Sequence, residues 1–181
     1  MKEPYIQVSI PYAPGKRLDI AYNTIIEKTD AEWFLFLDHD VFLGTNNLWY
    51  SMCIDAIKQL EKEKVGWITC KTNRIGCRRQ LHNEEPSDDI LKHILIAKKL
   101  YKKYGNQVSQ IGKTKLSGFF ILTNKTAWKE VGGFRHMGKG LSKIDNDYSV
   151  RLRQAGFKSY ILNGLYLYHM WKKVKKEVFN W

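Results

Sequence analysis

The strongest constraint on this sequence is an apolar run, Trp33-Phe34-Leu35-Phe36-Leu37, that ends in Asp38-His39-Asp40. An uninterrupted apolar run of this length is typical of a strand buried on both faces, as in a parallel sheet between two helix layers. Carboxylates directly after such a strand lie at the edge where α/β sheets bind ligands. The run therefore predicts an α/β fold with a functional site at the end of this central strand.

Asp38 and Asp40 are separated by one residue, so both carboxylates can converge on one hard cation. Oxygen ligands of this kind suit Mg²⁺ or Mn²⁺, which shares its remaining positions with phosphate oxygens. The alternative is a structural turn, because Asp after a strand often bonds its own backbone. The pair alone does not decide between these two interpretations.

The chain has 181 residues, the length of one domain, and its 30 Lys and Arg against 18 Asp and Glu give a net charge of +12. This excess predicts an anionic partner, which can be nucleotide phosphates, nucleic acid or an acidic membrane surface. Cys53, Cys70 and Cys77 lack Cys-x-x-Cys spacing, which argues against a disulfide framework or a zinc site and favours a reducing compartment. No apolar run has the length of a spanning helix and no signal-peptide core follows Met1. We therefore expect a cytoplasmic location, with peripheral contact to an anionic membrane as an open alternative.

The rest of the sequence alternates strand and helix patterns. We expect strands at residues 6–10, 65–70, 115–123, 157–162 and 165–168, and helices at residues 17–28, about 47–63, 90–103, 124–131 and 143–155. The polar segment 71–86 is expected to be a loop over or beside the ligand crevice, and a solvated basic loop is an equally open interpretation. Its basic residues are Arg74, Arg78, Arg79 and His82.

The helix expected after Ser87-Asp88-Asp89 combines an apolar stripe with many lysines. The stripe consists of Ile90, Leu91, Ile94, Leu95 and Leu100, and the lysines are Lys92, Lys98, Lys99, Lys102 and Lys103. Such a helix usually covers a sheet. Contact with an acceptor or a membrane is the alternative.

Four further features carry candidate chemistry, each with a structural alternative. Gly118 allows a ligand or backbone to approach closely, or marks a bulge. Asp145 and Asp147 are either first-turn acids that suit the helix dipole or include a general base. His169 is either a partly buried structural residue or a metal ligand. Residues 170–181 form a basic, aromatic tail that could dock on the body, close over a pyrophosphate or contact an anionic membrane.

The order of these motifs resembles the GT-A glycosyltransferases, and among them family 2. The resemblance extends from Val8 to His169. Its motifs are a first strand ending near Pro-x-Tyr, an Arg-x5-Asn helix, the D-x-D strand, a Ser-Gly-Phe strand, a Gly-Gly-Phe turn, an acidic helix start running into Arg-Leu-Arg-x-Ala-Gly, and a late His. It implies one GT-A domain over residues 1–169, with a mostly parallel central sheet flanked by helices, followed by the tail.

The resemblance also implies a role for individual residues. Asp38 matches the acid near the ribose of the donor, and Asp38, Asp40 and His169 match the ligands of a Mn²⁺ or Mg²⁺ ion that holds the donor diphosphate. The residues that match the nucleotide and donor-sugar pocket are Pro11, Tyr12, Ala13, Arg17, Asn23, His39, Ser117 and Gly118. The implied donor is a nucleoside-diphosphate sugar, with a UDP-sugar favoured, and the acceptor is a glycan or another hydroxyl compound.

Asp145 matches the catalytic Asp of this family, counted back from Arg151-Leu152-Arg153-Gln154-Ala155-Gly156. As a general base it would deprotonate the acceptor hydroxyl and invert the configuration at C1. The sequence departs from the family at Ile144, where the family has Glu, so Asp147 remains a second candidate and a retaining course an alternative. Only ten residues separate Tyr12 from Asn23, where the family inserts a base-recognition unit, which leaves the nucleotide open.

Two other functions compete with glycosyl transfer. A sugar-phosphate nucleotidyltransferase also uses a sheet, a metal and acids, but residues 11–17 lack the glycine-rich phosphate loop that we would expect of it. A basic nucleic-acid-binding module would explain the net charge, but carboxylates at a buried strand end repel phosphate unless a metal bridges them. We therefore expect no nucleic-acid partner, and the sequence does not predict the oligomeric state.

Overall fold

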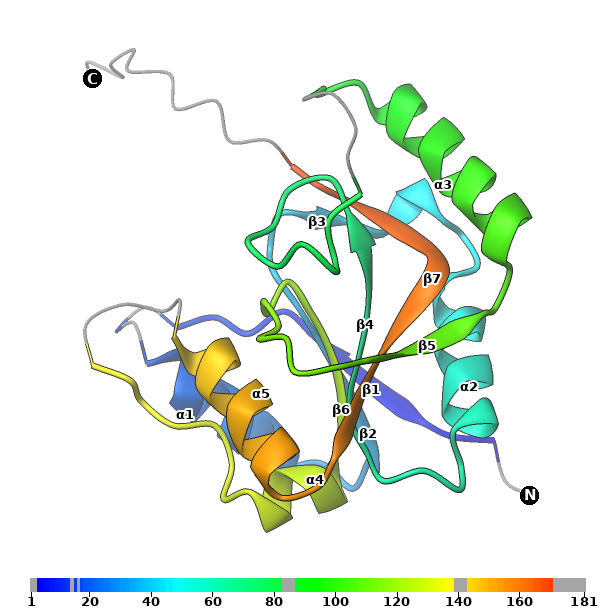
Figure 1. The fold of residues 1–181 in the computed structure, drawn as a ribbon. Coiled ribbons are helices and arrows are strands. Elements are labelled where there is room, and N and C mark those ends of the chain that lie inside the picture. Colours follow the sequence, from blue (N-terminus) through cyan, green and yellow to red (C-terminus); the bar gives the residue numbers. More distant parts are fainter. Residues whose placement is uncertain (1–2, 14, 16, 83–86, 139–142, 171–181) are drawn as a thin grey trace, which may run out of the picture.

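The computed structural model describes residues 3–13, 15, 17–82, 87–138 and 143–170, and Figure 1 shows them as an α/β fold around a seven-stranded open sheet. The sheet order is β1-β2-β6-β4-β7-β3, and β5 also pairs with β7. The strands are β1 (Ile6–Ser9), β2 (Trp33–Leu37), β3 (Val41–Phe42), β4 (Val65–Thr72), β5 (Val108–Ile111), β6 (Phe120–Asn124) and β7 (Lys158–His169). The helices are α1 (Leu18–Glu27), η1 (Leu43–Thr45), α2 (Trp49–Gln59), α3 (Ile90–Tyr104), α4 (Lys125–Glu130) and α5 (Ile144–Gln154).

The sheet is mixed, so the prediction of a mostly parallel sheet is wrong. Among the strands of the described residues, β1 with β2 and β4 with β7 pair in parallel, whereas β6 is antiparallel to both β2 and β4. β3 and β5 are also antiparallel to β7. An apolar run indicates that a strand is buried on both faces, but it does not indicate whether the strand is parallel or antiparallel to its neighbours. β6 is buried throughout and therefore reads like a parallel strand.

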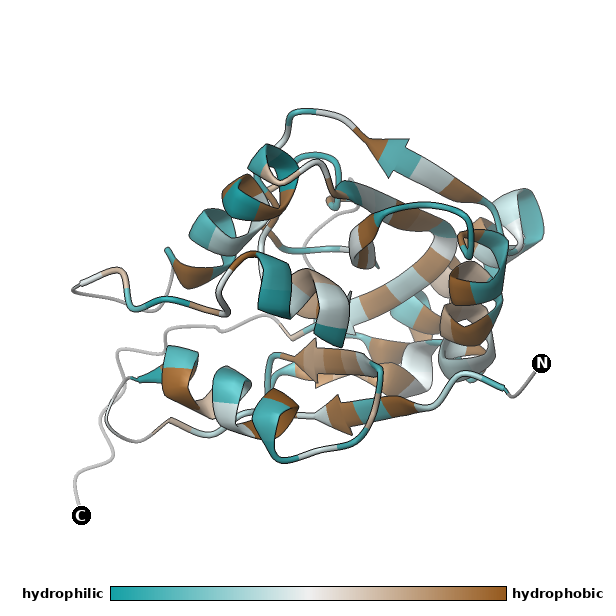
Figure 2. Ribbon diagram, turned by 90° about the horizontal axis from the view of Figure 1, so that it is seen from below, coloured by the Kyte–Doolittle hydropathy of each residue, from teal (hydrophilic) through white to brown (hydrophobic). Residues whose placement is uncertain are grey.

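Helices cover both faces of the sheet. On one face α2 packs against β1, β2, β4 and β7, and α3 packs against Tyr166 of β7. On the other face α1, α4 and α5 enclose an aromatic core that includes Phe36, Phe134 and Tyr148. In Figure 1 the two helix groups lie on opposite sides of the strands, and Figure 2 shows hydrophobic strands between helices with many hydrophilic positions. The central strand β2 is apolar along its whole length, and the candidate site lies at its end.

Several elements differ from the expectation. The two short strands expected at residues 157–162 and 165–168 are one strand, β7, and β5 was not expected at all. α2 ends at Gln59 rather than residue 63, and the side chain of Asn46 bonds the N–H of Leu48 just before the helix instead of capping its first turn. β6 begins at Phe120, five residues after the expected start, because residues 115–119 form a loop against neighbouring segments.

α3 buries a different face from the expected stripe. The buried residues are His93, Ile96, Ala97 and Leu100, whereas Ile90, Leu91 and Leu95 are exposed. Asp89 caps the helix by accepting the N–H of Leu91, as the sequence predicted.

Within the part of the chain that is described, no helix is both long enough and apolar enough to cross a bilayer. Residues 171–181, to which the sequence assigns a lid or an amphipathic helix, lie outside the described residues.

Candidate metal and donor site

The candidate site forms where β2 ends and β3 meets β7. The N–H of Asp38 donates to the carbonyl of Phe119 at 3.1 Å, which fixes the end of β2 against the start of β6. After a tight turn, β3 pairs antiparallel with β7 so that Val41 lies opposite His169. The N–H of Met170 donates to the carbonyl of Asp40 at 2.8 Å. This pairing brings two segments that lie 129 positions apart in the sequence into contact.

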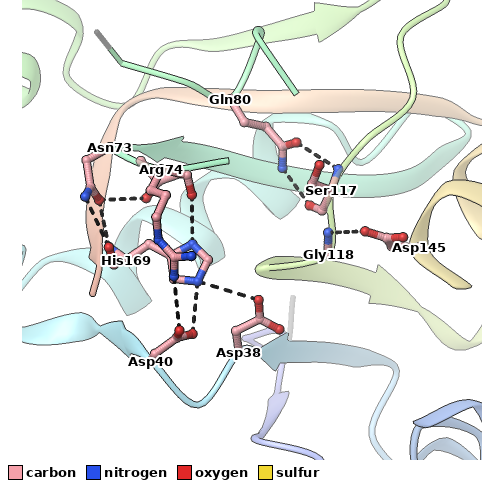
Figure 3. Close-up of polar contacts among 10 residues, drawn as sticks. Asp38, Asp40, Asn73, Arg74, Gln80, Ser117, Gly118, Asp145 and His169 are labelled. Atoms are coloured by element: carbon pink, nitrogen blue, oxygen red, sulfur yellow. Dashed lines mark hydrogen bonds and ion pairs between the residues drawn. The ribbon is translucent and has the colours of Figure 1, made fainter. Parts of the chain in front are cut away.

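The side chains of Asp38, Asp40 and His169 converge there, and one ligand atom from each lies within 4.8 Å of the other two. His169 Nε2 is 2.9 Å from Asp40 Oδ1 and 3.8 Å from Asp38 Oδ2 (Figure 3). Asp40 and His169 are buried, whereas the Asp38 side chain is 42 % exposed. The protein therefore encloses Asp40 and His169, whereas Asp38 faces solvent. A ligand could reach the cluster from the side of Asp38.

The orientation of the His169 ring leaves Nε2 able to bind a cation. Nδ1 lies 2.9 Å from the carbonyl oxygen of Arg74, and because a carbonyl only accepts hydrogen bonds, Nδ1 is assigned as the donor. Nε2 then faces Asp40 Oδ1 at 2.9 Å, and the guanidinium of Arg74 is a positive charge on the other oxygen of the same carboxylate. A metal ion beside Nε2 and Asp40 would be a second one. A backbone carbonyl on the opposite nitrogen is the usual support of a metal-binding His.

Two residues of the loop after β4 complete this end of the site. Arg74 Nη2 lies 3.1 Å from Asp40 Oδ2, and Arg74 Nε is buried without a hydrogen-bond partner among the described residues. Asn73 accepts the N–H of His169 at 2.9 Å and donates to its carbonyl at 3.1 Å. The sequence placed this loop over or beside the crevice, and at Arg74 the structure confirms that position.

Gln80, which the sequence did not single out, holds the same loop against the segment before β6. It is fully buried, and its amide donates to Ser117 O at 2.9 Å and to Thr69 Oγ1 at 2.8 Å while accepting the N–H of Ser117 at 2.9 Å. These bonds fix the backbone of Ser117 and thereby the position of Gly118. A polar residue in a loop gives no sequence signal for such a role, because Gln is usually solvated there.

Asp145 lies on the other side of this segment, in the first turn of α5. Its Oδ2 accepts the N–H of Gly118 at 2.8 Å, and its Oδ1 accepts the N–H of Asn146 at 2.7 Å. Burial raises the pKa of Asp145; the two hydrogen bonds oppose that shift, and the negative charge of Asp38 adds to it. A Cβ on residue 118 would lie 3.0 Å from the Asp145 Cβ, so a larger residue would crowd Asp145. The group that approaches Gly118 closely is thus the Asp145 side chain, whereas the sequence led us to expect a ligand, another backbone segment or a bulge.

Asp147 has a different environment from Asp145. Its Oδ2 accepts a hydrogen bond from Arg151 Nε at 2.8 Å and forms an i, i+4 ion pair with Arg151 Nη2 at 2.6 Å, one turn along the same helix. Arg151 Nη1 in turn donates to the carbonyl of Val131 at 2.5 Å. Asp147 therefore holds the arginine that links α5 to the end of α4.

The residues assigned to the nucleotide pocket are only partly brought to this cluster. Tyr12 is 83 % exposed, and Arg17 forms two hydrogen bonds, at 2.9 and 2.8 Å, with Asp19. Asn23 holds the turn at Phe134, where it accepts that residue's N–H at 2.9 Å and donates to its carbonyl at 2.9 Å. Pro11 and Ala13 lie half-buried on the β1–α1 loop, and His39 is exposed in the turn between the two acids.

Tyr22 is a buried residue of α1 that lies near the candidate site. It is buried against Phe36 and Phe134, with ring centroids 4.7 and 4.5 Å away. Burial raises its pKa, and the charges of Asp38 and Asp145 raise it further. Asp38 and Asp145 therefore both lie within electrostatic range of the Tyr22 phenol, which stays protonated.

Searches against models of known protein families and against curated proteins find no match.

Proposed function

We propose that this chain is a metal-dependent glycosyltransferase that moves a sugar from a nucleoside-diphosphate sugar, with a UDP-sugar favoured, to an acceptor hydroxyl. The observation that carries the proposal is the convergence of Asp38, Asp40 and His169, because these are the three residues that match the metal ligands of the GT-A glycosyltransferases. Nothing in the local sequence around His169 brings it to Asp40. The contact depends on the antiparallel pairing of β3 with β7.

The donor set fits a divalent cation. Two carboxylates suit Mn²⁺ and Mg²⁺, and the imidazole shifts the preference toward Mn²⁺, since Mg²⁺ is bound mainly by oxygen. Three protein ligands leave coordination positions for phosphate oxygens. Such an ion, when bound, neutralises the charge that develops on a departing diphosphate.

The neighbouring residues supply the remaining charges that the reaction needs. Arg74 is the nearest cationic side chain to the cluster, and its guanidinium is held over Asp40 with one N–H unused among the described residues. We assign it to a phosphate oxygen of the donor, for which a planar guanidinium is well suited. In the proposed site Gln80 positions Ser117 and Gly118, and Gly118 positions Asp145.

In this proposal Asp145 is the general base. Burial raises its pKa, which brings the carboxylate closer to the range in which it accepts a proton efficiently. The proton of the acceptor hydroxyl moves to an Asp145 oxygen while the hydroxyl oxygen bonds C1 and the C1–diphosphate bond breaks. Attack opposite the leaving group inverts the configuration at C1. Asp147 is less suited to this role because its carboxylate is paired with Arg151.

The test is release of nucleoside diphosphate from a panel of UDP-, GDP- and dTDP-sugars and of CMP from a CMP-sugar, with Mn²⁺ or with EDTA. We expect turnover only with Mn²⁺ or Mg²⁺. Asp145→Asn should lower kcat by about 10² to 10⁴ without a large change in donor KM, because a general base contributes that much. Asp147→Asn is the control and should retain most of the activity. Equal rates in wild type and Asp145→Asn would exclude Asp145 as the base, and turnover in EDTA would exclude a metal requirement.

A further inference from the structure

A second concave site lies under α3, separate from the residues of the metal and donor site. It is a cavity of about 540 Å³, which is within the usual range for small-molecule sites. Its lining comes from β4, the loop after β4, α3, the connection between α3 and β5, β5 and β7. Asp40, His169 and Asp145 are not among the lining residues.

The cavity exists because β7 bulges beside Lys71. Cys70 pairs with Leu162 and Lys71 with Tyr166, so residues 163–165 of β7 have no partner in β4 at this point. Gly164 lies in this bulge, where a Cβ would collide with the carbonyl oxygen of Gly105 at the end of α3. The close contact of these two glycines joins the bulge to α3. Asn163 is thereby turned toward Ser109, to which its side-chain amide donates at 2.7 Å.

The cavity wall is strongly basic. Lys71, Lys99 and Lys103 line it together with His82, and no Asp or Glu is among the lining residues. In the described part of the chain the three lysines form no ion pair. Burial lowers the pKa of Lys71; Tyr104 opposes this shift and Arg79 adds to it, while Lys71 Nζ donates to the Arg79 carbonyl at 2.6 Å. An anion bound beside Lys71 would offset the cost of burying its charge.

We propose that this cavity binds a phosphate group, carried either by a soluble phosphorylated compound or by a lipid headgroup. The ammonium groups of Lys71, Lys99 and Lys103 supply charge, and the side chains of Gln107, Ser109 and Asn163 supply neutral hydrogen-bonding groups in the same lining. Ile96, Leu100 and Tyr104 add apolar surface that a bare inorganic ion would not use. The ligand class is therefore a phosphate ester or diphosphate with an organic part. The inference does not depend on the proposed transferase activity.

α3 provides a matched pair of variants for the test. Lys99 and Lys103 line the cavity, whereas Lys98 and Lys102 are exposed on the same helix, outside the lining residues. Lys99→Gln with Lys103→Gln removes the same charge as Lys98→Gln with Lys102→Gln. All four side chains are exposed, so both double variants should keep the wild-type fold, which circular dichroism checks.

The first measurement is calorimetric titration of the full chain with inorganic pyrophosphate in EDTA, which prevents metal-bridged binding at Asp38, Asp40 and His169. We expect the Lys99/Lys103 double variant to bind at least about tenfold more weakly than wild type, and the Lys98/Lys102 control to stay within about twofold. Equal weakening in both variants would show diffuse electrostatic attraction and overturn the proposal. Wild-type affinity in the Lys99/Lys103 variant would also overturn it. A wild-type protein that binds neither pyrophosphate nor the anionic vesicles would overturn it as well.

The second measurement identifies the source of the phosphate. Sedimentation with vesicles of phosphatidylcholine containing phosphatidic acid is compared with sedimentation with pure phosphatidylcholine vesicles. Exposed Leu91 and Leu95, on the outward face of α3, could insert into a bilayer. Binding to the anionic vesicles that requires Lys99 and Lys103 but not Lys98 and Lys102 supports the lipid source. Pyrophosphate binding without vesicle binding supports the soluble source, and equal dependence on all four lysines contradicts both.

Discussion

Gln80→Leu tests whether a buried amide fixes the loop that carries Arg74 to the segment that carries Gly118. The substitution keeps the approximate size of the side chain and removes its polar atoms. Wild-type Gln80 makes three side-chain hydrogen bonds, at 2.8, 2.9 and 2.9 Å, to Thr69 Oγ1, Ser117 O and Ser117 N. Leucine leaves all three of these partner groups without their protein partner.

The expected loss of stability follows from the burial of those partners. A buried polar group that loses its only partner costs about 1 to 3 kcal/mol. Thr69 is fully buried, but its hydroxyl can rotate, and Ser117 is half-buried, so water replaces part of what it loses. Allowing for this recovery, we expect the free energy of unfolding to fall by about 3 kcal/mol. This is a large fraction of the roughly 5 to 15 kcal/mol that stabilises a typical domain.

The assay is urea unfolding followed by tryptophan fluorescence, with wild type, Gln80→Leu and the control Gln110→Leu. Gln110 is an exposed residue of β5, so its substitution should change the unfolding free energy by less than about 0.5 kcal/mol. Gln80→Glu adds a second check, because a neutral Glu can still donate one bond. It should be less stable than wild type at pH 7 and recover in part at low pH. A Gln80→Leu protein within about 0.5 kcal/mol of wild type would refute the reasoning.

Three other predictions follow from single contacts. Because burial holds the pKa of Asp145 above 3.8, the acidic limb of a pH–rate profile for sugar transfer should lie above that value, and a limb below it would contradict the assignment. The hydrogen bond from Arg17 holds the pKa of Asp19 below 3.8, so this pair should stabilise the fold above about pH 4 and less as the pH falls. Asp19→Asn should therefore lose about 1 kcal/mol at pH 7, and little at pH 2, in chemical denaturation. Gly164→Ala should destabilise by about 3 kcal/mol or prevent folding, since its Cβ would collide with Gly105; a wild-type melting temperature would contradict this.

The sequence predicted best the elements in which burial determines the spacing of apolar residues. β2 is an apolar run and was placed correctly, and α1 has a clear helical period. β5 was missed because Val-Ser-Gln-Ile is half polar and pairs only along one side, at the edge of the sheet. The direction of β6 could not be read from its residues, because burial on both faces gives the same apolar run in either direction.

In the candidate site, too, the sequence reveals residues that follow a local pattern and misses those whose role depends on a distant contact. Asp38 and Asp40 are recognisable from their position after a buried strand, and Gly118 from its place before another. Local pattern leaves His169 ambiguous, because its contact with Asp40 depends on how β3 pairs with β7. Gln80 gave no signal, since its function depends on a partner that lies 37 positions away.

The metal site is tested most directly by titrating the full chain with Mn²⁺ and following the free ion by electron paramagnetic resonance. Wild type should bind one ion, and Asp40→Asn and His169→Gln should each bind at least about tenfold more weakly, as expected when a metal ligand is removed. His39→Gln is the control, because His39 is exposed between the two acids and is not part of the converging group. Its affinity should stay within about twofold of wild type. Wild-type protein that leaves Mn²⁺ free, or His169→Gln that binds it as wild type does, would contradict the account.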